Sequence, residues 1–271
     1  MSSPNNKICF VTAFFDLNRD SWPLFKRTFN EYLSSFGNFV NLFDDKNTQA
    51  ELIAYIDDRH LDQVYELTKS HKQITIIPMN QDFMHTNLPM WKTLEREREI
   101  MNSEKFRNMI PHRLIYPEHT IPEYTLINHC KIDFVSCVIN SNITDAYYFS
   151  WVDFGYCSTK ESIPDKLLDI SKLNLEKVNY TLVNALTEYD KDIIYTLKYA
   201  PERIGGFFFF GNRNVLKEYQ SLYHKILELY QGNNIADDDQ ALALACYWTK
   251  PDLFHLHGPF GWHKALVKFQ L

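Results

Sequence analysis

The sequence predicts an α/β fold with a mainly parallel central sheet that is flanked by helices. Short runs of β-branched and aromatic residues alternate with longer segments of helical periodicity, and several of these runs are apolar throughout, as in strands that are covered on both faces. The length of 271 residues suffices for one large α/β domain or two small ones. The hydrophobic share of 45% and the charged share of 23% are ordinary for a globular protein.

Composition argues against some partners and favours a cytoplasmic location. The formal net charge of −6 disfavours duplex nucleic acid, which requires clustered positive charge, but it is compatible with a nucleotide. Five scattered cysteines without a C-x-x-C pair favour reduced thiols over a disulfide framework or a zinc knuckle. Neither a signal peptide nor an apolar run of membrane-spanning length is recognised. We therefore expect a cytoplasmic protein without a transmembrane segment.

The N-terminal part of the chain carries three predicted strands. The first covers residues 8–15 and runs into a polar loop without the G-x-G-x-x-G pattern, which disfavours a dinucleotide-binding fold. A helix capped by Ser21 and ended by Gly37 is predicted next, because aromatic residues recur at helical spacing. Strands at 52–56 and 74–77, with a short helix between them, complete a β-α-β-α-β series.

The middle of the chain is predicted to be less regular. Residues 80–120 are polar, with one charged helix over 91–101. An amphipathic helix is predicted over 123–138, and it contains Lys131. This lysine either reaches an anion at the edge of the sheet or lies on the surface.

An aromatic stretch, residues 147–156, is predicted to contain the central buried strand of the sheet. The strand stops at Asp153, and Gly155 follows. Open α/β sheets bind ligands at the carboxyl ends of their strands, which makes Asp153 the first candidate for chemistry. Gly155 permits close approach of a ligand, although Asp and Gly are also ordinary turn residues.

The C-terminal part is predicted to contain strands at 180–185 and 203–212, followed by a long helix over 214–230. Four consecutive phenylalanines in the second strand require burial on both faces. Gly205 and Gly206 precede the phenylalanines and permit close approach of a ligand or of neighbouring backbone.

Three acids, Asp237, Asp238 and Asp239, precede a predicted helix that starts at Ala241. One acid suffices as the cap, and a second complements the helix dipole. At least one acid therefore remains as a base, as a ligand of an acceptor hydroxyl or as a neighbour of a metal.

Histidines are concentrated near the C-terminus, where His255, His257 and His263 lie beside Lys264. This density favours a metal and phosphate site over isolated structural roles. An imidazole together with Asp153 can hold Mn²⁺ or Mg²⁺ while a diphosphate supplies the remaining oxygens. The metal neutralises a leaving nucleoside diphosphate, and a spare acid can deprotonate an acceptor hydroxyl. This chemistry is that of a nucleotide-sugar-dependent glycosyltransferase.

The order of elements resembles that of GT-A glycosyltransferases, and four short motifs are more narrowly similar to the bacterial HtrL/YibB (WlaTC) family. The motifs are V-T-A-F-F-D at 11–16 with Arg19, K-I-D-F at 131–134, W-x-D-x-G-Y at 151–156 and D-D-Q at 238–240. The resemblance spans nearly the whole chain. It implies a single GT-A-like (Rossmann-like) domain over 1–271, with a nucleotide-sugar-binding half at about 1–156 and an acceptor-binding half at about 157–271.

The resemblance also implies roles for individual residues. Asp153 falls on the D-x-D metal motif of GT-A enzymes, with Gly155 in place of the second acid. The segment H-G-x-x-G-W-x-K at 257–264 resembles a C-terminal loop of retaining GT-A enzymes, which implies His257 as the second metal ligand, with His255 in reserve. Asp239, with Asp238 beside it, falls near the base of inverting enzymes and near the acceptor-binding acid of retaining ones. The implied donor-binding residues are Thr12, Phe14, Arg19, Lys131, Asp153, Gly155, Gly205, Gly206, His257 and Lys264.

We therefore expect a glycosyltransferase that moves a sugar from a nucleotide diphosphate sugar to a hydroxyl of a glycan or glycolipid. The family suggests surface polysaccharide or lipopolysaccharide synthesis, in which the acceptor brings the enzyme to the inner face of the membrane. One alternative is a metal-dependent phosphoesterase built on His255, His257 and the acids at 237–239. Another is a non-catalytic module that binds a nucleotide or a glycan. One sequence does not identify the sugar, the base, the acceptor, the stereochemistry or the oligomeric state.

Overall fold

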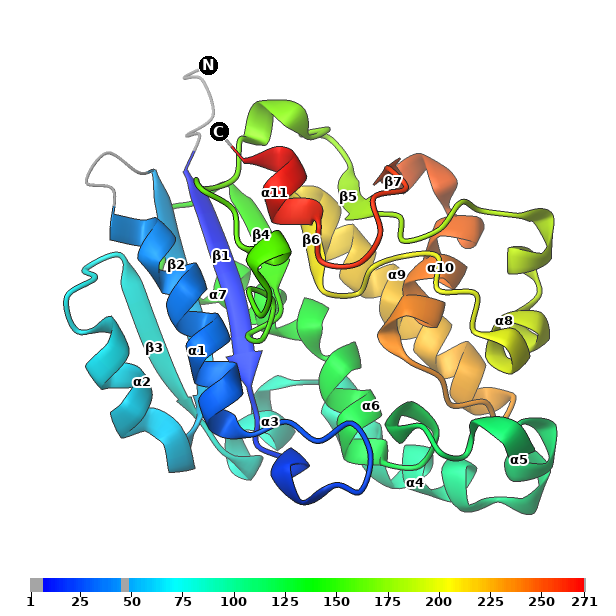
Figure 1. Ribbon diagram of the computed structural model, residues 1–271. Helices are drawn as coiled ribbons and strands as arrows, with labels where there is room; N and C mark the ends of the chain where they lie inside the picture. The colour runs from blue at the N-terminus through cyan, green and yellow to red at the C-terminus, as the bar shows by residue number, and fades with distance from the viewer. Residues whose placement is uncertain (1–6, 45–48, 271) are drawn as a thin grey trace.

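Seven strands form one mixed sheet with helices on both faces in the computed structural model, which describes residues 7–44 and 49–270 (Figure 1). The strands are β1 Ile8–Phe14, β2 Ala50–Asp57, β3 Ile74–Met79, β4 Tyr148–Val152, β5 Val178–Thr181, β6 Phe208–Asn212 and β7 Phe254–His257. The α-helices are α1 Phe29–Val40, α2 Leu61–Thr68, α3 Gln81–Asn87, α4 Leu94–Asn102, α5 Glu104–Met109, α6 Pro122–His129, α7 Lys131–Ser141, α8 Ile193–Tyr199, α9 Arg213–Gly232, α10 Asp239–Thr249 and α11 Ala265–Phe269. The predicted single α/β domain with a mainly parallel sheet is confirmed.

The strand order is β3-β2-β1-β4-β6-β5-β7. Strands β3, β2, β1 and β4 are parallel, whereas β6 runs antiparallel to both of its neighbours, β4 and β5. The carboxyl ends of β1 and β4 therefore meet the start of β6 at one edge of the sheet. The backbone reflects this arrangement, because the amide of Asp153 donates to the carbonyl oxygen of Phe207 at 3.1 Å.

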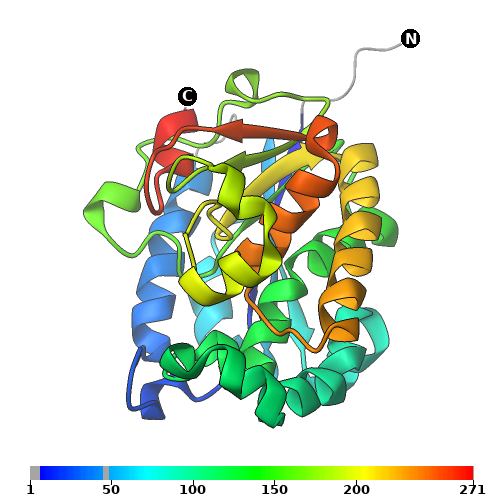
Figure 2. The ribbon, with the colours of Figure 1, turned by 90° about the vertical axis from the view of Figure 1, so that its right-hand side faces the viewer.

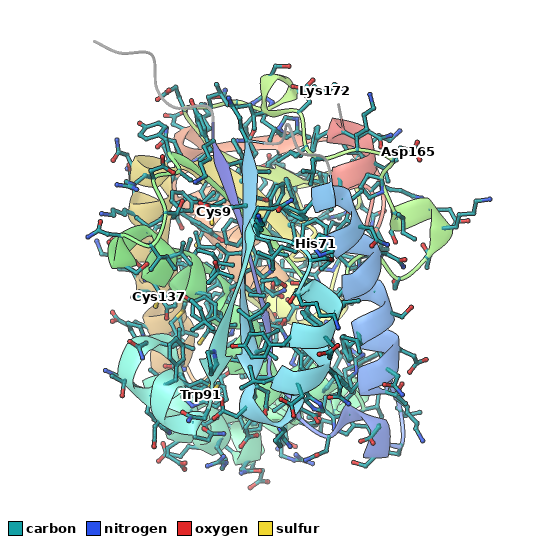
Figure 3. The ribbon with its side chains drawn as sticks, turned by 90° about the vertical axis from the view of Figure 1, so that its left-hand side faces the viewer. Cys9, His71, Trp91, Cys137, Asp165 and Lys172 are labelled. Carbon is teal, nitrogen blue, oxygen red and sulfur yellow. The ribbon has the colours of Figure 1, made fainter. Side chains whose placement is uncertain are left out.

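Two apolar layers cover the two faces of the sheet. In β1, Cys9 and Val11 point toward the layer that contains α7 and α9, while Ile8, Phe10 and Phe14 point toward α1. This alternation is the period of two that a strand with two buried faces requires. Figure 3 views the sheet along its β3 edge, with α1 and α2 on one side and α7, which carries the labelled Cys137, on the other. Strand β7 lies at the opposite edge of the sheet (Figure 2).

Helix α1 begins seven residues later than the Ser21 cap predicted. Its cap is Thr28, whose hydroxyl accepts from the amide of Glu31, while the Glu31 carboxylate accepts from the amide of Thr28. This reciprocal pair is a capping box, and the pattern T-x-x-E at 28–31 was its signal in the sequence. Residues 22–28 are thereby left outside the helix, and they form part of a wall described below.

The predicted amphipathic helix over 123–138 is two helices, because the chain changes direction at Cys130 between α6 and α7. The break places Lys131 in the first turn of α7. The region 80–120 is also more regular than predicted, since it contains α3, α4 and α5.

Several strand boundaries, including those of β3 and β6, differ from the prediction as well. Strand β3 continues through Pro78. Proline has no amide hydrogen to donate, and an edge strand tolerates this because it has a neighbouring strand on one side only. Strand β6 starts only at Phe208, which leaves Gly205 and Gly206 in the connection before it. Within residues 7–44 and 49–270, no helix has both the length and the apolar character needed to span a bilayer.

Candidate functional site

A cavity of about 470 Å³ opens at the sheet edge where β1 and β4 end. Figure 1 shows this edge at the lower end of β1, next to the loop that precedes α1 and next to α6. We call this space the main cavity. The predicted site residues that line it are Phe14, Arg19, Lys131, Asp153, Gly155, Gly206 and Asp239. They come from six separate parts of the sequence, and the sheet topology brings them together.

A buried ion-pair cluster forms the floor of the main cavity, and we call it the Lys131 cluster. The Nζ atom of Lys131 lies 3.0 Å from Asp153 Oδ1 and 2.8 Å from Asp239 Oδ2. It also donates to the carbonyl oxygen of Gly206 at 3.0 Å. Burial lowers the pKa of the Lys131 ammonium, but the two carboxylates raise it by more, so the pKa lies above its ordinary value. Lys131 is therefore a permanent buried cation and not a surface lysine.

The three acids at the start of α10 have three different environments. Asp238 is the helix cap, since its Oδ1 accepts from the amide of Ala241 at 2.9 Å. Asp239 follows in the first turn and faces Lys131. Burial raises the pKa of Asp239, and the Lys131 ammonium acts against this shift. Asp237 is buried as well, and burial raises its pKa too.

Gly206 allows Asp239 to lie close to the backbone. A Cβ atom at this position would be 2.3 Å from Asp239 Oδ2, which is far inside van der Waals contact. A close approach of a ligand or of backbone was predicted at the glycine pair, and the group that approaches Gly206 is the side chain of Asp239. Gly205 does not line the main cavity, and a Cβ there would meet the ring of Phe207 at 2.5 Å.

Asp153 presents one carboxylate oxygen to the protein and remains partly open to the main cavity. Its Oδ1 accepts from the indole Nε1 of Trp151 at 2.6 Å and lies within ion-pair distance of Lys131. Its side chain keeps 34% of its exposure, compared with 8% for Lys131. Oδ2 is therefore the atom that is available to a ligand.

Two arginines line the other wall of the main cavity and meet at Tyr32. Arg19 Nη1 donates to Tyr32 Oη at 2.7 Å. The guanidinium of Arg27 lies 4.0 Å from the centre of the Tyr32 ring, and its Nη2 donates to the carbonyl oxygen of Gly155 at 3.1 Å. Arg27 was not predicted, because its loop was assigned to a helix that starts at Ser21.

Besides Gly205, three predicted donor-binding residues lie outside the main cavity. Thr12 is buried within β1, on the face that α1 covers. His257 lies at the end of β7, and its Nε2 is 2.9 Å from the side-chain oxygen of Asn179. Lys264 Nζ donates to the carbonyl oxygen of Glu161 at 3.2 Å. Because β7 is three strands away from β4, at about 4.8 Å per strand, His257 lies roughly 14 Å across the sheet from the end of β4.

The structure therefore does not bring Asp153 and His257 together as a metal pair, and it places the reserve ligand His255 on the same distant strand. Another histidine, His263, lines the main cavity instead, with its ring stacked on Phe207 at 4.7 Å. Burial lowers the pKa of His263, although Asp153 acts in the opposite direction. The chain reverses between β7 and this residue, at a loop that the spacing of the histidines did not reveal.

Metal ligands do not gather in the part of the chain that the structure describes. Among these residues, no three His, Cys, Asp or Glu side chains are placed so that they could hold a metal ion. The side chains of these types that line the main cavity are Asp16, Asp20, His60, Asp153, Asp239 and His263.

A second cavity of about 180 Å³ adjoins the first. Tyr124, Asn128, Asp239 and Gln240 line both cavities. The remaining wall of the second cavity includes the predicted residue Asp238 and two cations; its charged members are Arg113, Glu118, Glu202, Arg203, Asp237 and Asp238. Asp239 therefore lines both of these adjoining spaces.

Comparison with known proteins gives a structural neighbour and a sequence relative. The crystal structure of mouse xyloside xylosyltransferase 1, in its apo form, matches with a TM-score of 0.49 and 9% sequence identity, over 93% of this chain and 84% of that chain. Protein HtrL of Escherichia coli (strain K12) is 27% identical over 257 residues, which cover 91% of this chain and 86% of that protein. Residues 6–270 match the family described as "Bacterial protein of unknown function (HtrL_YibB)". The chain belongs to the HtrL_YibB family.

Proposed function

We propose that this protein is a GT-A-type glycosyltransferase that moves a sugar from a nucleotide diphosphate sugar to a hydroxyl of a glycan or glycolipid. The observation that carries the proposal is the Lys131 cluster. Two carboxylates from distant parts of the chain converge on one buried ammonium, at the carboxyl edge of a mainly parallel sheet. This edge is where open α/β sheets bind their ligands. The motif resemblance to GT-A enzymes supports the same reading.

The donor fits the main cavity. Arg19 and Arg27 supply cations for the diphosphate, and guanidinium groups bind phosphate oxygens in bidentate fashion. Phe14 and the stacked pair of Phe29 and His60, with ring centres 3.8 Å apart, supply an aromatic wall for the base. Asp153 Oδ2 is placed to accept a hydrogen bond from a hydroxyl of the donor. These assignments make residues up to about 156 the larger part of the nucleotide-sugar-binding half.

The acceptor fits the second cavity. Asp239 lines both cavities, so an acceptor hydroxyl in the second one comes next to a sugar in the first. Burial raises the pKa of Asp239, and the ammonium of Lys131 acts against this by favouring the ionised form. A carboxylate in the ionised form can accept the proton of the hydroxyl. Asp238 holds the first turn of α10 in place as its cap and is thus a positioning residue for Asp239.

The arrangement favours transfer over phosphate-ester hydrolysis. The phosphoesterase alternative requires His255 and His257 to act together with the acids before α10. Neither histidine lines the main or the second cavity. The non-catalytic alternative shares the same cavities and is separated from the transferase by measured turnover. For the pathway we keep the suggestion from the family resemblance, which is surface polysaccharide or lipopolysaccharide synthesis on the cytoplasmic side of the membrane.

The test is a transfer assay with a panel of UDP-, GDP-, CMP- and dTDP-sugars and with bacterial glycan acceptors. We expect the wild-type protein to transfer one sugar and Asp153→Ala to abolish transfer while its thermal unfolding stays cooperative. Asp252→Ala removes an exposed acid near β7 and serves as the control with wild-type activity. Full activity of Asp153→Ala would sink the assignment of the site, and binding without turnover for every donor would favour the non-catalytic module.

A further inference from the structure

The GT-A resemblance implies a divalent metal at Asp153, and the residues of this site do not fit one. The second acid of the D-x-D motif is Gly155. The histidine expected to complete the site, His257, lies on a distant strand and contacts Asn179. In the part of the chain that the structure describes, no three potential ligand side chains gather around a common point. The question is therefore what neutralises a bound diphosphate in place of the metal.

Arg27 occupies the space that the missing acid requires. A Cβ atom built on Gly155 would lie 2.4 Å from Arg27 Nη1, so the guanidinium stands where the side chain of a second acid begins. Three contacts hold Arg27 there. Its Nη2 donates to the carbonyl oxygen of Gly155 at 3.1 Å and to Ser35 Oγ at 2.8 Å, and its guanidinium stacks on Tyr32 at 4.0 Å.

The remaining acid of the motif already has a cation. Asp153 Oδ1 is bound by the Lys131 ammonium and by the indole of Trp151. A divalent ion on Asp153 would lie close to the Lys131 ammonium and in the same cavity as the Arg27 guanidinium. Both charges are fixed by buried or stacked contacts, and both repel a second cation.

We infer that this site binds a nucleoside diphosphate without a divalent cation, and that the guanidinium of Arg27 neutralises the diphosphate where other enzymes of this fold use a metal. This inference rests on the proposed function. In the transfer step, the bond between the anomeric carbon and the diphosphate oxygen breaks, and its electron pair stays on the diphosphate beside Arg27. A bond forms between the anomeric carbon and the acceptor oxygen, whose proton passes to the carboxylate of Asp239.

The first experiment measures the binding of UDP, GDP, CDP and dTDP by calorimetry, in EDTA and again in MnCl₂ or MgCl₂. We expect one nucleoside diphosphate to bind in EDTA with a dissociation constant within about twofold of that in Mn²⁺, a difference well below the tenfold that a lost charged contact produces. Binding only in the presence of a metal would overturn the inference and leave the proposed function intact. Failure of every nucleoside diphosphate under both conditions would overturn the proposed function and this inference with it.

The second experiment tests Arg27 against its neighbour Lys26, an exposed cation that does not line the main cavity. We expect Arg27→Met to weaken metal-free binding by about tenfold or more, since a charge-assisted bidentate contact is lost, while Lys26→Met binds as the wild type does. Arg27→Lys keeps the charge without the planar fork, and it covers the case in which the methionine variant does not fold. Wild-type affinity in EDTA for Arg27→Met or Arg27→Lys would contradict the assignment.

A third experiment restores the second acid of the D-x-D motif in a double variant. Arg27→Ala combined with Gly155→Asp restores an acid and clears the space in front of it. We expect Mn²⁺ to strengthen nucleotide binding in this double variant and to leave Arg27→Ala alone unchanged. An equal response of the two variants to Mn²⁺ would show that the guanidinium and the metal do not compete for one place.

Discussion

The Lys131 cluster and strand β7 both concentrate residues that bind metals, phosphates or protons, yet only one of them forms a site. Lys131, Asp153 and Asp239 are far apart in the sequence and meet within 3.0 Å. His255 and His257 are two residues apart, with ring centres separated by 4.4 Å, and neither lines the main cavity or the second one. Their proximity follows from the alternation of a strand, which places residues i and i+2 on one face.

This comparison shows that polar residues close together in the sequence need not form a site, whereas residues from separate segments that meet in the fold can form one. A central strand of a parallel sheet ends where several other elements also end, so one acid at that point acquires partners from all of them. A strand at the edge of the sheet has fewer neighbours, and its polar residues satisfy one another. For His257, the partner is the amide of Asn179, while for Asp239 it is a buried ammonium.

The largest expected effect concerns the charge balance of the Lys131 cluster. Lys131→Met leaves the buried carboxylate of Asp239 and the partly exposed carboxylate of Asp153 without their cation, and we expect a loss of about 3–5 kcal/mol in the free energy of unfolding at neutral pH. At about 2–4 °C per kcal/mol, the midpoint of thermal unfolding falls by roughly 6–20 °C. The loss shrinks at acidic pH, because burial raises the pKa of Asp239 and its protonated form no longer needs the ammonium. Lys264→Met is the matched control, and an equal drop in both variants would contradict the special role of Lys131.

A smaller effect is expected from the packing of Gly206 against Asp239. Gly206→Ala places a methyl group 2.3 Å from Asp239 Oδ2 and forces the carboxylate to move. A displacement of this order at a reacting group lowers turnover by about 10²-fold. Gly232→Ala, at the end of α9, meets nothing within 4 Å and is the control with wild-type turnover. Unchanged kcat in Gly206→Ala would remove Asp239 from the reaction.

The smallest effect is the pH dependence that His257 contributes to stability. Burial lowers its folded-state pKa to about 4, compared with an ordinary value of 6.5. The folded state therefore binds fewer protons than the unfolded state between these values, and stability rises with pH across this window and is constant above it. We expect His257→Asn to abolish this part of the slope in the pH profile of thermal unfolding, with turnover within about threefold of wild type because the residue lies outside both cavities. A loss of turnover as large as that of Asp153→Ala would restore His257 to the site.

The strand-end acid and the acids before α10 could be found from the sequence, because strand ends and helix starts have clear local signals. Asp153 and Asp239 are the acids that these two signals identify. The burial of Lys131 could not be found, since it depends on the break at Cys130, and the sequence on both sides of Cys130 is helical in pattern. Position in the fold, and not residue type, decides which lysine becomes part of the cluster.

The errors in the site have a common cause in loop geometry. The resemblance of residues 257–264 to a loop of retaining GT-A enzymes points to His257, whereas the structure places His263 at the main cavity. Arg27 was hidden by the assignment of its segment to a helix, even though the capping box at Thr28 and Glu31 gives the correct helix start. The capping box places Arg27 in the loop before α1, but no local sequence pattern predicts its contact with Gly155.

The contact between Gly155 and Arg27 has a consequence for evolution within the family. A side chain at position 155 would require the guanidinium at position 27 to move, because both use the same volume. We expect relatives with an acid at the first position to have lost the arginine at the second. Paired change at these two sites, 128 residues apart, would let a simple comparison of sequences divide the family into metal-using and metal-free branches.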